Sequence, residues 1–397
     1  MSVHDHAPSL ALNRIFRPTA ELGEADPDAP LRAFDYPDGR TGWLVAGYEL
    51  ARTVLADPRF SSRAELKRAP VSRPGADSFY GQPTPPGWFI DLDGADHTRF
   101  RRVLARHFTA RRMRELRPWV ERIARDCLDE VARAAAPADL VGTFSLAVPL
   151  QSICELLGVP YSERDWLKRD STTLFSLEAT AEQGADAMTE LETYFHELIR
   201  HSRAHPTDGL ISDLANGGQL TDDEVSGAGV LLLTAGHETV ASMLGLGTLA
   251  MLGAPDNVPL VVGDADTAAA AIEELLRYLS ILHFGIPRGA REDVTIGDTL
   301  IRAGDAVTVA LPAANRDPSR FAAPDVLDLG RDARGHVAFG HGVHQCVGQN
   351  LARLELSVAL PALFRRFPTL RLAVPAQEVA MARHAATYSV RRLPVIW

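Results

Sequence analysis

Ten residues near the end of the chain place a single thiol among glycines. They run from Phe339 to Gly348 and read Phe-Gly-His-Gly-Val-His-Gln-Cys-Val-Gly, with the thiol at Cys346. A thiolate is a strong, soft metal ligand, and glycine allows close approaches that a Cβ would block. The loop could therefore bring a large flat ligand against its backbone, with Phe339 covering one side of the sulfur.

Two other interpretations of Cys346 stay open on the residues alone. A lone cysteine is most often a buried core thiol. His341, His344 and Cys346 could instead bind zinc, although zinc sites usually take their ligands in pairs. The sequence contains no CxxC or HExxH motif to supply a second pair.

A second set of reactive side chains lies inside an apolar stretch. The pentapeptide Ala-Gly-His-Glu-Thr at 235–239 places an acid beside an alcohol in a helix expected over 225–252, after a capping box. A buried carboxylate is costly unless it is paired or used. Gly236 weakens the helix by about 1 kcal/mol relative to alanine, and a local opening there could admit water. Alternatively, Thr239 bonds the carbonyl one turn earlier and Glu238 points to solvent.

Two further pairs of charged side chains have helical spacing. His97 and Arg101 are four residues apart, so they would share one helix face and could hold a carboxylate. Spacing alone favours a solvated basic face there. Glu274 and Arg277 are three apart, which by itself indicates an ion pair worth roughly a few tenths of a kcal/mol.

Together these motifs resemble those of one family. Phe-Gly-x-Gly-x-His-x-Cys-x-Gly resembles the cysteine-ligand loop of the cytochrome P450 haem-thiolate monooxygenases, and it lies about fifty residues from the C-terminus as in that family. The pentapeptide at 235–239 is similar to the family's Ala/Gly-Gly-x-Asp/Glu-Thr motif. His97 with Arg101, and Glu274 with Arg277, resemble its His-x-x-x-Arg and Glu-x-x-Arg pairs. The four motifs stand in the family's order, and the resemblance covers almost the whole chain from about Thr41.

This resemblance implies a mainly α fold with a small β region, the triangular haem domain of the family. It implies one haem b, with Cys346 as the ligand of the haem iron. Glu238 and Thr239 would be catalytic, because an acid and an alcohol can relay protons during dioxygen activation while the thiolate pushes electron density from the opposite side. Retention of Thr239 favours monooxygenation over the relatives that rearrange peroxides.

The resemblance also implies what surrounds the cofactor and the substrate. Glu274 and Arg277 would tie the core to the segment before the cysteine loop, with Arg331 completing this network, and Arg288 would hold a propionate as His97 and Arg101 do. The implied cofactor contacts are Cys346, His97, Arg101, Arg288, His344, Phe339, Gly340, Gly348 and Ala235. The implied substrate pocket contains Phe89, Ile90, Phe175, Leu232, His283, Phe284, Thr387 and Tyr388.

The elements expected to position these residues follow from periodicity and breakers. The prediction is an irregular lead-in over 1–40 and a single haem domain over 41–397, with a long loop over the ligand site at 63–95. It places strands at 41–45, 294–301 and 307–311, the last two in one small sheet, and helices at 48–56, 118–135, 146–157, 185–204 and 350–360.

Composition narrows the class of protein. A net charge of −10 over 397 residues argues against nucleic-acid binding. No apolar run reaches the roughly 18 residues of a membrane span, and the N-terminus lacks an apolar signal core. Three cysteines suit a reducing cytoplasm, and Cys127 and Cys154 are expected to be core thiols. The protein is expected to be a monomer.

The expected reaction is hydroxylation or epoxidation of a small apolar organic molecule, and the style of the loop resembles actinobacterial enzymes of secondary metabolism. Phenol coupling or nitrogen insertion shares every motif. A haem sensor or ligand carrier would not need Glu238 and Thr239.

The chain lacks a flavin domain and a dinucleotide fingerprint, so ferredoxin and ferredoxin reductase would supply electrons. Eight arginines between Arg99 and Arg117, against the single acid Glu115, would dock the ferredoxin.

Overall fold

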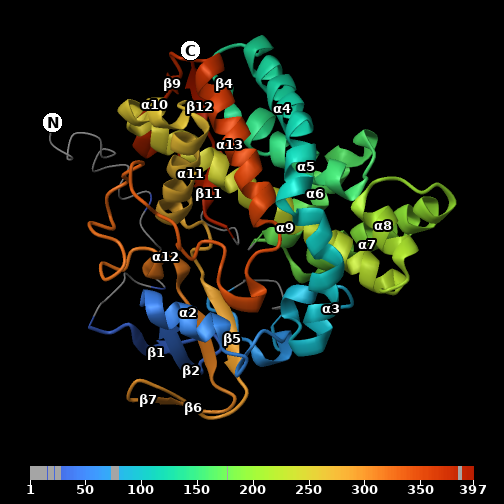
Figure 1. The fold of residues 1–397 in the computed structure, drawn as a ribbon, viewed down its shortest axis with the longest axis vertical. Coiled ribbons are helices and arrows are strands. Elements are labelled where there is room, and N and C mark those ends of the chain that lie inside the picture. The colour runs from blue at the N-terminus through green and yellow to red at the C-terminus, as the bar shows by residue number, and fades with distance from the viewer. Residues whose placement is uncertain (1–15, 17–21, 23–27, 73–79, 177, 383–386) are drawn as a thin grey trace.

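The computed structural model describes residues 16, 22, 28–72, 80–176, 178–382 and 387–397, with the backbone alone at 161, 164, 165 and 175. Helices form most of the molecule, and small sheets lie toward its margins (Figure 1). The longer helices are α2 Tyr48–Ala56, α3 Gly94–Ala105, α4 Ala110–Arg133, α5 Ala147–Leu157, α6 Arg164–Phe175, α7 Ala181–Ala204, α8 Leu210–Gly217, α9 Asp222–Gly253, α11 Ala265–Leu279 and α13 Gln349–Arg366, with α10 Val258–Val261 and α12 Leu311–Ala314 as short turns.

Helix α9 runs through the core, because it is apolar around its whole surface. The expected capping box begins it: Thr221 Oγ1 accepts from Glu224 N at 3.2 Å, and Glu224 Oε2 accepts from Thr221 N at 2.9 Å. Helices α5, α7 and α13 pack against it. By length and hydropathy α9 could cross a membrane, but 78% of its apolar stretch is buried inside the protein, as in a core helix.

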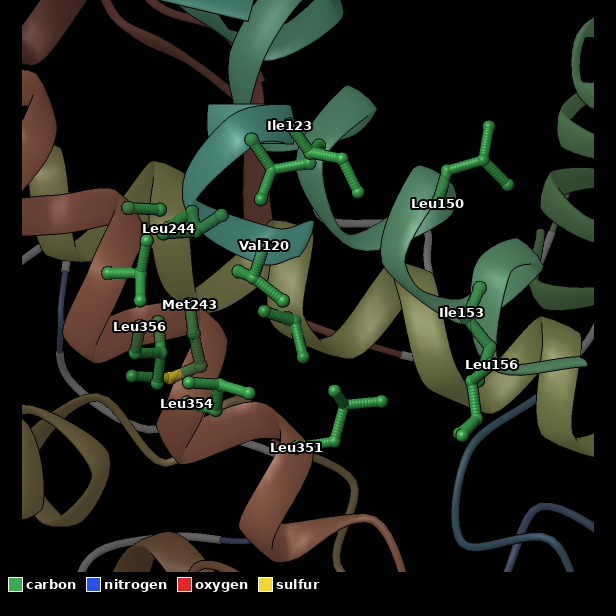
Figure 2. Packing of buried hydrophobic residues seen from close by; sticks show 14 of the residues in the cluster. Val120, Ile123, Leu150, Ile153, Leu156, Met243, Leu244, Leu351, Leu354 and Leu356 are labelled. Carbon is green, nitrogen blue, oxygen red and sulfur yellow. The ribbon is translucent and has the colours of Figure 1, made fainter. Parts of the chain in front are cut away.

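Aliphatic faces of α4, α5 and α13 meet beside α9. Figure 2 shows members of this cluster, and burial of each one contributes roughly 1.5–3 kcal/mol. Cys127 and Cys154 belong to the same cluster at 2% and 0% exposure, so their prediction as core thiols is confirmed. The labelled members are Val120 and Ile123 of α4, Leu150, Ile153 and Leu156 of α5, Met243 and Leu244 of α9, and Leu351, Leu354 and Leu356 of α13.

Helix α4 begins earlier than the expected start at residue 118. Its first residue is Ala110, and Thr109 Oγ1 caps it by accepting from Arg112 N at 3.2 Å. Pro118 lies inside the helix, where it removes one backbone donor. It is exposed, so water can satisfy the freed carbonyl. Proline at a first helical turn is common, which makes it a misleading boundary here.

The main sheet has the order β1-β2-β8-β5-β3 and lies at the edge occupied by the N-terminal part of the chain (Figure 1). Strand β1 pairs antiparallel with β2, so the expectation of an irregular lead-in through residue 40 is wrong at this strand. A Pro-Asp-Gly turn joins the two strands, with Gly39 at φ +79°. A short edge strand next to prolines reads as loop in sequence. The strands are β1 Leu31–Asp35, β2 Thr41–Val45, β8 Ala306–Val309, β5 Ile286–Ala290 and β3 Phe60–Ser61.

The remaining strands form three small sheets. The expected single sheet from 294–301 and 307–311 is wrong, because β6 and β7 form a hairpin of their own while β8 joins the main sheet between β2 and β5. Leu311 begins α12 instead of ending a strand. These sheets comprise β6 Val294–Ile296 with β7 Thr299–Ile301, β10 Ala380–Ala382 with β11 Ser389–Arg392, and β12 Pro394–Ile396 between β4 Ala138–Asp139 and β9 Arg371–Leu372.

Candidate active site

The cysteine loop closes on itself and lies against α2. Cys346 N donates to Phe339 O at 2.9 Å. Gly340 and Gly342 adopt φ of +71° and +75°, a region that L side chains rarely occupy. A Cβ on Gly342 would lie 2.6 Å from Leu55 O, so the loop backbone packs directly against the backbone of α2. These two glycines therefore fix the path of the loop that presents the sulfur.

The surroundings of Cys346 contain groups that stabilise a thiolate. Burial raises the pKa of the Cys346 thiol, and the backbone N–H groups of Gly348 and Gln349 at the start of α13 act against this rise. The positive charges of Arg101 and Arg353 act in the same direction. The sulfur thus lies at a helix N-terminus with two guanidinium groups nearby, which suits a negatively charged metal ligand.

Both alternative interpretations of the thiol lose support. Cys127 and Cys154 belong to the hydrophobic core cluster whereas Cys346 does not, so Cys346 is not a core thiol. In the part of the chain that the structure describes, no three His, Cys, Asp or Glu side chains are grouped as a metal site. The zinc interpretation with His341 and His344 therefore has no geometric basis.

Five cationic or titratable side chains act on one another near the sulfur: Lys67, His97, Arg101, Arg288 and His344. The rings of His97 and His344 stack with centroids 3.9 Å apart. Burial, reinforced by neighbouring positive charges, lowers the pKa of His97 to about 4 and that of His344 to about 2. Since His97 is only 3% exposed, the solvated basic face that spacing favoured is wrong there.

Most of this cluster lacks a negative partner. Of these five side chains, only Lys67 forms an ion pair within the described part of the chain, and its partner is Asp91. Arg288 is 5% exposed, its hydrogen bond goes to the carbonyl of Pro287, and burial lowers its pKa to about 10. Buried guanidinium groups are normally paired with carboxylates or phosphates. The donor set therefore fits the two carboxylates of a haem, which would lie with its iron at Cys346.

On α9 the acid and the alcohol are held by hydrogen bonds. Thr239 Oγ1 donates to Ala235 O at 2.8 Å, so the alternative in which Thr239 bonds the carbonyl one turn earlier is confirmed. Glu238 does not point freely to solvent: its Oε1 accepts from Thr172 Oγ1 of α6 at 2.6 Å, and its side chain is 16% exposed. The expected opening at Gly236 is absent, since α9 is continuous. A Cβ on Gly236 would lie 2.8 Å from Ile153 Cγ1, so the glycine permits close packing of α5 on α9.

The Glu274–Arg277 pair is a fully buried network. Arg277 donates to both oxygens of Glu274 at 2.6 and 2.8 Å, and neither side chain is exposed. Arg331 Nε also donates to Glu274, at 3.2 Å, which completes the network as expected. Arg277 Nη1 donates to Asn315 O at 2.7 Å, and Asn315 Oδ1 accepts from Val337 N at 2.8 Å. The network thus reaches the segment just before the cysteine loop.

The structure brings together some of the residues expected in the substrate pocket. His283 and Tyr388 stack with centroids 4.2 Å apart and an interplanar angle of 10°. Thr387 Oγ1 lies 3.0 Å from Ser242 Oγ of α9, one turn after Thr239. The C-terminal segment therefore meets both α9 and the residues that precede β5.

Other expected pocket residues have different surroundings. Phe89 is 2% exposed and stacks on Phe100 with centroids 5.9 Å apart, inside the core cluster. Leu232 also belongs to that cluster, whereas Ile90 is 46% exposed and Phe284 half-buried. The side chain of Phe175 lies outside the described residues. The pocket as a whole stays a prediction.

Sequence reasoning missed several polar residues near the site. Thr172 and His237 contact Glu238, and Lys67 lies in the cluster of His97, Arg101, Arg288 and His344. Arg353 donates to Glu273 at 2.6 Å and lies near the sulfur. Lys67 offered one signal, because it is one of two lysines in the chain. His237 offered another, because it lies beside Glu238 in the pentapeptide, whereas the partners of Thr172 and Arg353 lie far away in sequence.

Comparison with known proteins agrees with this arrangement. A sequence model described as cytochrome P450 matches residues 267–381. Cytochrome P450-SU2 of Streptomyces griseolus is 42% identical over 383 residues, which cover 96% of this chain and 94% of that protein. The solved structure of CYP105P1 in complex with filipin I has a TM-score of 0.90 and 36% identity, covering 99% of this chain and 98% of its own.

A second solved structure, the mycinamicin VIII C21 methyl hydroxylase MycCI from Micromonospora griseorubida bound to mycinamicin VIII, has a TM-score of 0.86 and 36% identity. It covers 92% of this chain and 93% of its own. The predicted mainly α fold with a small β region is confirmed by these likenesses. Because the identity extends over nearly the whole chain, this protein belongs to the cytochrome P450 family of haem b monooxygenases.

Proposed function

We propose that this protein uses dioxygen and externally supplied electrons to hydroxylate or epoxidise a small apolar organic molecule of secondary metabolism. The observation that carries the proposal is the half-buried acid Glu238 beside the alcohol Thr239 on α9. A haem protein that only sensed or carried a ligand would not require this pair. Two relatives support the substrate class, since one hydroxylates a methyl group of mycinamicin VIII and the other binds filipin I.

Each group of residues has its own task in this proposal. Cys346 holds the iron, while His97, Arg101 and Arg288 bind the propionates. Haem b ligated by a thiolate supplies the activation of dioxygen. Thr239 and Glu238 hold and pass protons on the α9 side. The remaining cofactor contacts are proposed at His344, Phe339, Gly340, Gly348 and Ala235.

The substrate would lie beside the contact between α9 and the C-terminal segment. The bonded hydroxyls of Thr387 and Ser242 fix that segment against α9, and the stacked rings of His283 and Tyr388 tie it to the residues before β5. A wall made of packed rings and mutually satisfied hydroxyls offers mostly apolar contact, which suits an apolar substrate. Phenol coupling and nitrogen insertion would use the same wall, so the product must be identified directly.

A ferredoxin and its reductase would deliver the electrons, and an arginine-rich surface would dock the ferredoxin. Ion pairs do not separate the candidate arginines, because Arg99, Arg106, Arg112, Arg117 and Arg353 each have an acidic partner. We choose by position, and the proposed arginine face consists of Arg112, Arg114, Arg117 and Arg353 on α4 and α13. The last three of these line a cavity of about 320 Å³ between α4, α11 and α13, and Arg353 acts on the charge of Cys346.

An acidic ferredoxin would be steered to the arginine face because its field opposes that of the acidic protein as a whole. We place the reaction in the cytoplasm, where free cysteines and a reducing supply of ferredoxin coexist.

The proposed function is tested with substrate and electrons together. Compounds that displace water from the haem should be found by difference spectroscopy across a library of apolar natural products, and turnover should add one oxygen atom. Thr239→Ala should still bind haem and substrate but divert electrons into peroxide or water, because it removes the alcohol of the pair. Equal product per NAD(P)H in the variant and the wild type would contradict the role of Thr239.

A further inference from the structure

His237 lies inside the α9 pentapeptide but has no task in the proposed function. Its side chain is 0% exposed. Its Nδ1 lies 3.0 Å from the carbonyl oxygen of Leu233, one turn earlier in the helix. A carbonyl can only accept a hydrogen bond, so Nδ1 must carry a proton.

The second ring nitrogen of His237, Nε2, faces two oxygens. It lies 3.4 Å from Ser171 Oγ and 3.4 Å from Glu238 Oε1. The Ser171 hydroxyl donates to Leu167 O at 2.6 Å, so its proton points away from the ring. Glu238 Oε1 accepts a second hydrogen bond, from Thr172 Oγ1. Both oxygens therefore present lone pairs to Nε2.

A neutral ring with its proton on Nδ1 would bring a nitrogen lone pair against these oxygen lone pairs. Inside a protein, polar groups left unpaired in this way are costly. One additional proton removes the conflict, either on Nε2 of His237 or on the carboxyl group of Glu238. In both forms the pair is neutral as a whole, which suits its buried place between α6 and α9.

We propose that His237 and Glu238 hold this additional proton between them as a buried proton store, with His237 as a positioning residue for Glu238. The inference rests on the proposed function, in which Glu238 passes protons. The pKa of Glu238 agrees with the store: burial raises it, but the hydrogen bond and charge of His237, the hydroxyl of Thr172 and the charge of Lys168 together bring it below its usual value.

Thr172 connects the store to solvent. It is exposed on α6, and it lines a cavity of about 620 Å³ between α6 and α7. Its hydroxyl can give its own proton to Glu238 Oε1 and take one from water in this cavity, so the threonine ends unchanged. When Glu238 passes a proton toward Thr239, one proton from water restores the store, and no group changes its oxidation state.

The first test counts protons without turnover. In the ferrous carbon monoxide complex of the holoenzyme, histidine carrying ¹⁵N is observed by NMR, and His237→Gln assigns the His237 signals. We expect both ring nitrogens to be protonated, with one of the two protons lost in Glu238→Gln. If the proton resides on Glu238 instead, the infrared spectrum should show a carboxylic acid band that Glu238→Gln removes. A singly protonated His237 beside an ionised Glu238 would overturn the proposal.

The second test follows electrons during turnover of an identified substrate. Glutamine keeps hydrogen-bonding atoms but cannot take an additional proton, so His237→Gln should raise the share of electrons lost as peroxide several-fold with substrate binding unchanged. The double variant with Glu238→Gln should be no worse than Glu238→Gln alone, because the two residues act as one unit.

Ser226→Ala is the matched control for this second test. Ser226 Oγ donates to Glu192 O of α7 at 3.1 Å, so its loss removes one buried hydrogen bond of α9 but no titratable group. The share of electrons that Ser226→Ala loses as peroxide should equal that of the wild type. Equal losses in Ser226→Ala and His237→Gln would show a structural effect and overturn the store. The NMR result does not depend on any substrate, so failure of the store is distinguishable from failure of the proposed function.

Discussion

The charged side chains behind the cysteine loop are closed off from solvent, whereas the acid on α9 is connected to it. Behind the cysteine loop, Glu274 and Arg277 are both 0% exposed and each of them is also bonded to further groups. On α9, Glu238 retains 16% exposure and bonds to Thr172, which itself reaches solvent. A closed network of this kind cannot change its proton number without large cost, whereas the open one can. The difference separates a scaffold from a group that does chemistry.

The largest effect is expected at the sulfur that the scaffold presents. Cys346→Ser should abolish the Soret band typical of thiolate ligation in the ferrous carbon monoxide complex, together with all product formation. Cys154→Ala is the control, because Cys154 lies in the core cluster at 0% exposure and should leave the band in place. A serine variant that kept the thiolate spectrum would remove the central assignment.

Opening the closed network should cost the most stability. Glu274→Gln leaves the Arg277 guanidinium buried without its counter-charge, so the free energy of unfolding should fall by about 3–5 kcal/mol, measured by urea denaturation of the holoenzyme. Asp332→Asn is the control: its partner Arg334 is 82% exposed, and such surface pairs hardly change the midpoint. If both variants shift the midpoint equally, the buried pair is not the scaffold.

Acid should weaken the protein through His283, which lies in the apolar wall. Burial lowers the pKa of His283 to about 4. Between pH 6.5 and 4 the unfolded chain binds a proton that the folded chain excludes, so stability falls as pH falls, by up to about 3 kcal/mol. His283→Phe keeps a ring against Tyr388 and should flatten this part of the stability profile. An unchanged slope in the variant would assign the acid sensitivity to other groups.

The smallest expected effect concerns the arginine face, which is exposed and screened by salt. Arg112→Glu or Arg114→Glu should slow reduction by ferredoxin several-fold and weaken its salt dependence, while reduction by dithionite is unchanged. Arg106→Glu carries the same charge change but lies outside the arginine face, beside Asp213, and should have less effect. If ferredoxin and dithionite respond alike, the docking surface lies elsewhere.

Sequence reasoning succeeded where the chemistry is local. Helix α9 followed from its apolar run and its capping box at Thr221, and Glu274 with Arg277 followed from helical spacing. The resemblance supplied Arg331, which lies 57 residues from Glu274 and has no local signal. Spacing alone gave the wrong environment for His97, because burial depends on what packs over a helix face and not on the face itself.

The missed features are contacts between distant segments. Thr172 and Glu238 are 66 residues apart, and neither segment predicts the other. Strand β1 is an edge strand whose pairing with β2 outweighs its weak propensity. Gly236 was expected to open α9, but the approach of Ile153 gives it a packing role that only the neighbouring helix reveals.

The burial of Cys127 and Cys154 has a practical consequence for handling the protein. Of the three cysteine sulfurs, these two are shielded at 2% and 0% exposure, so an alkylating reagent has a single cysteine target in the folded chain, at Cys346. A sulfur bound to iron does not react with such a reagent. Uptake of one label per molecule would therefore report the fraction of a preparation that lacks cofactor, and overnight oxidation of that fraction would make the loss permanent.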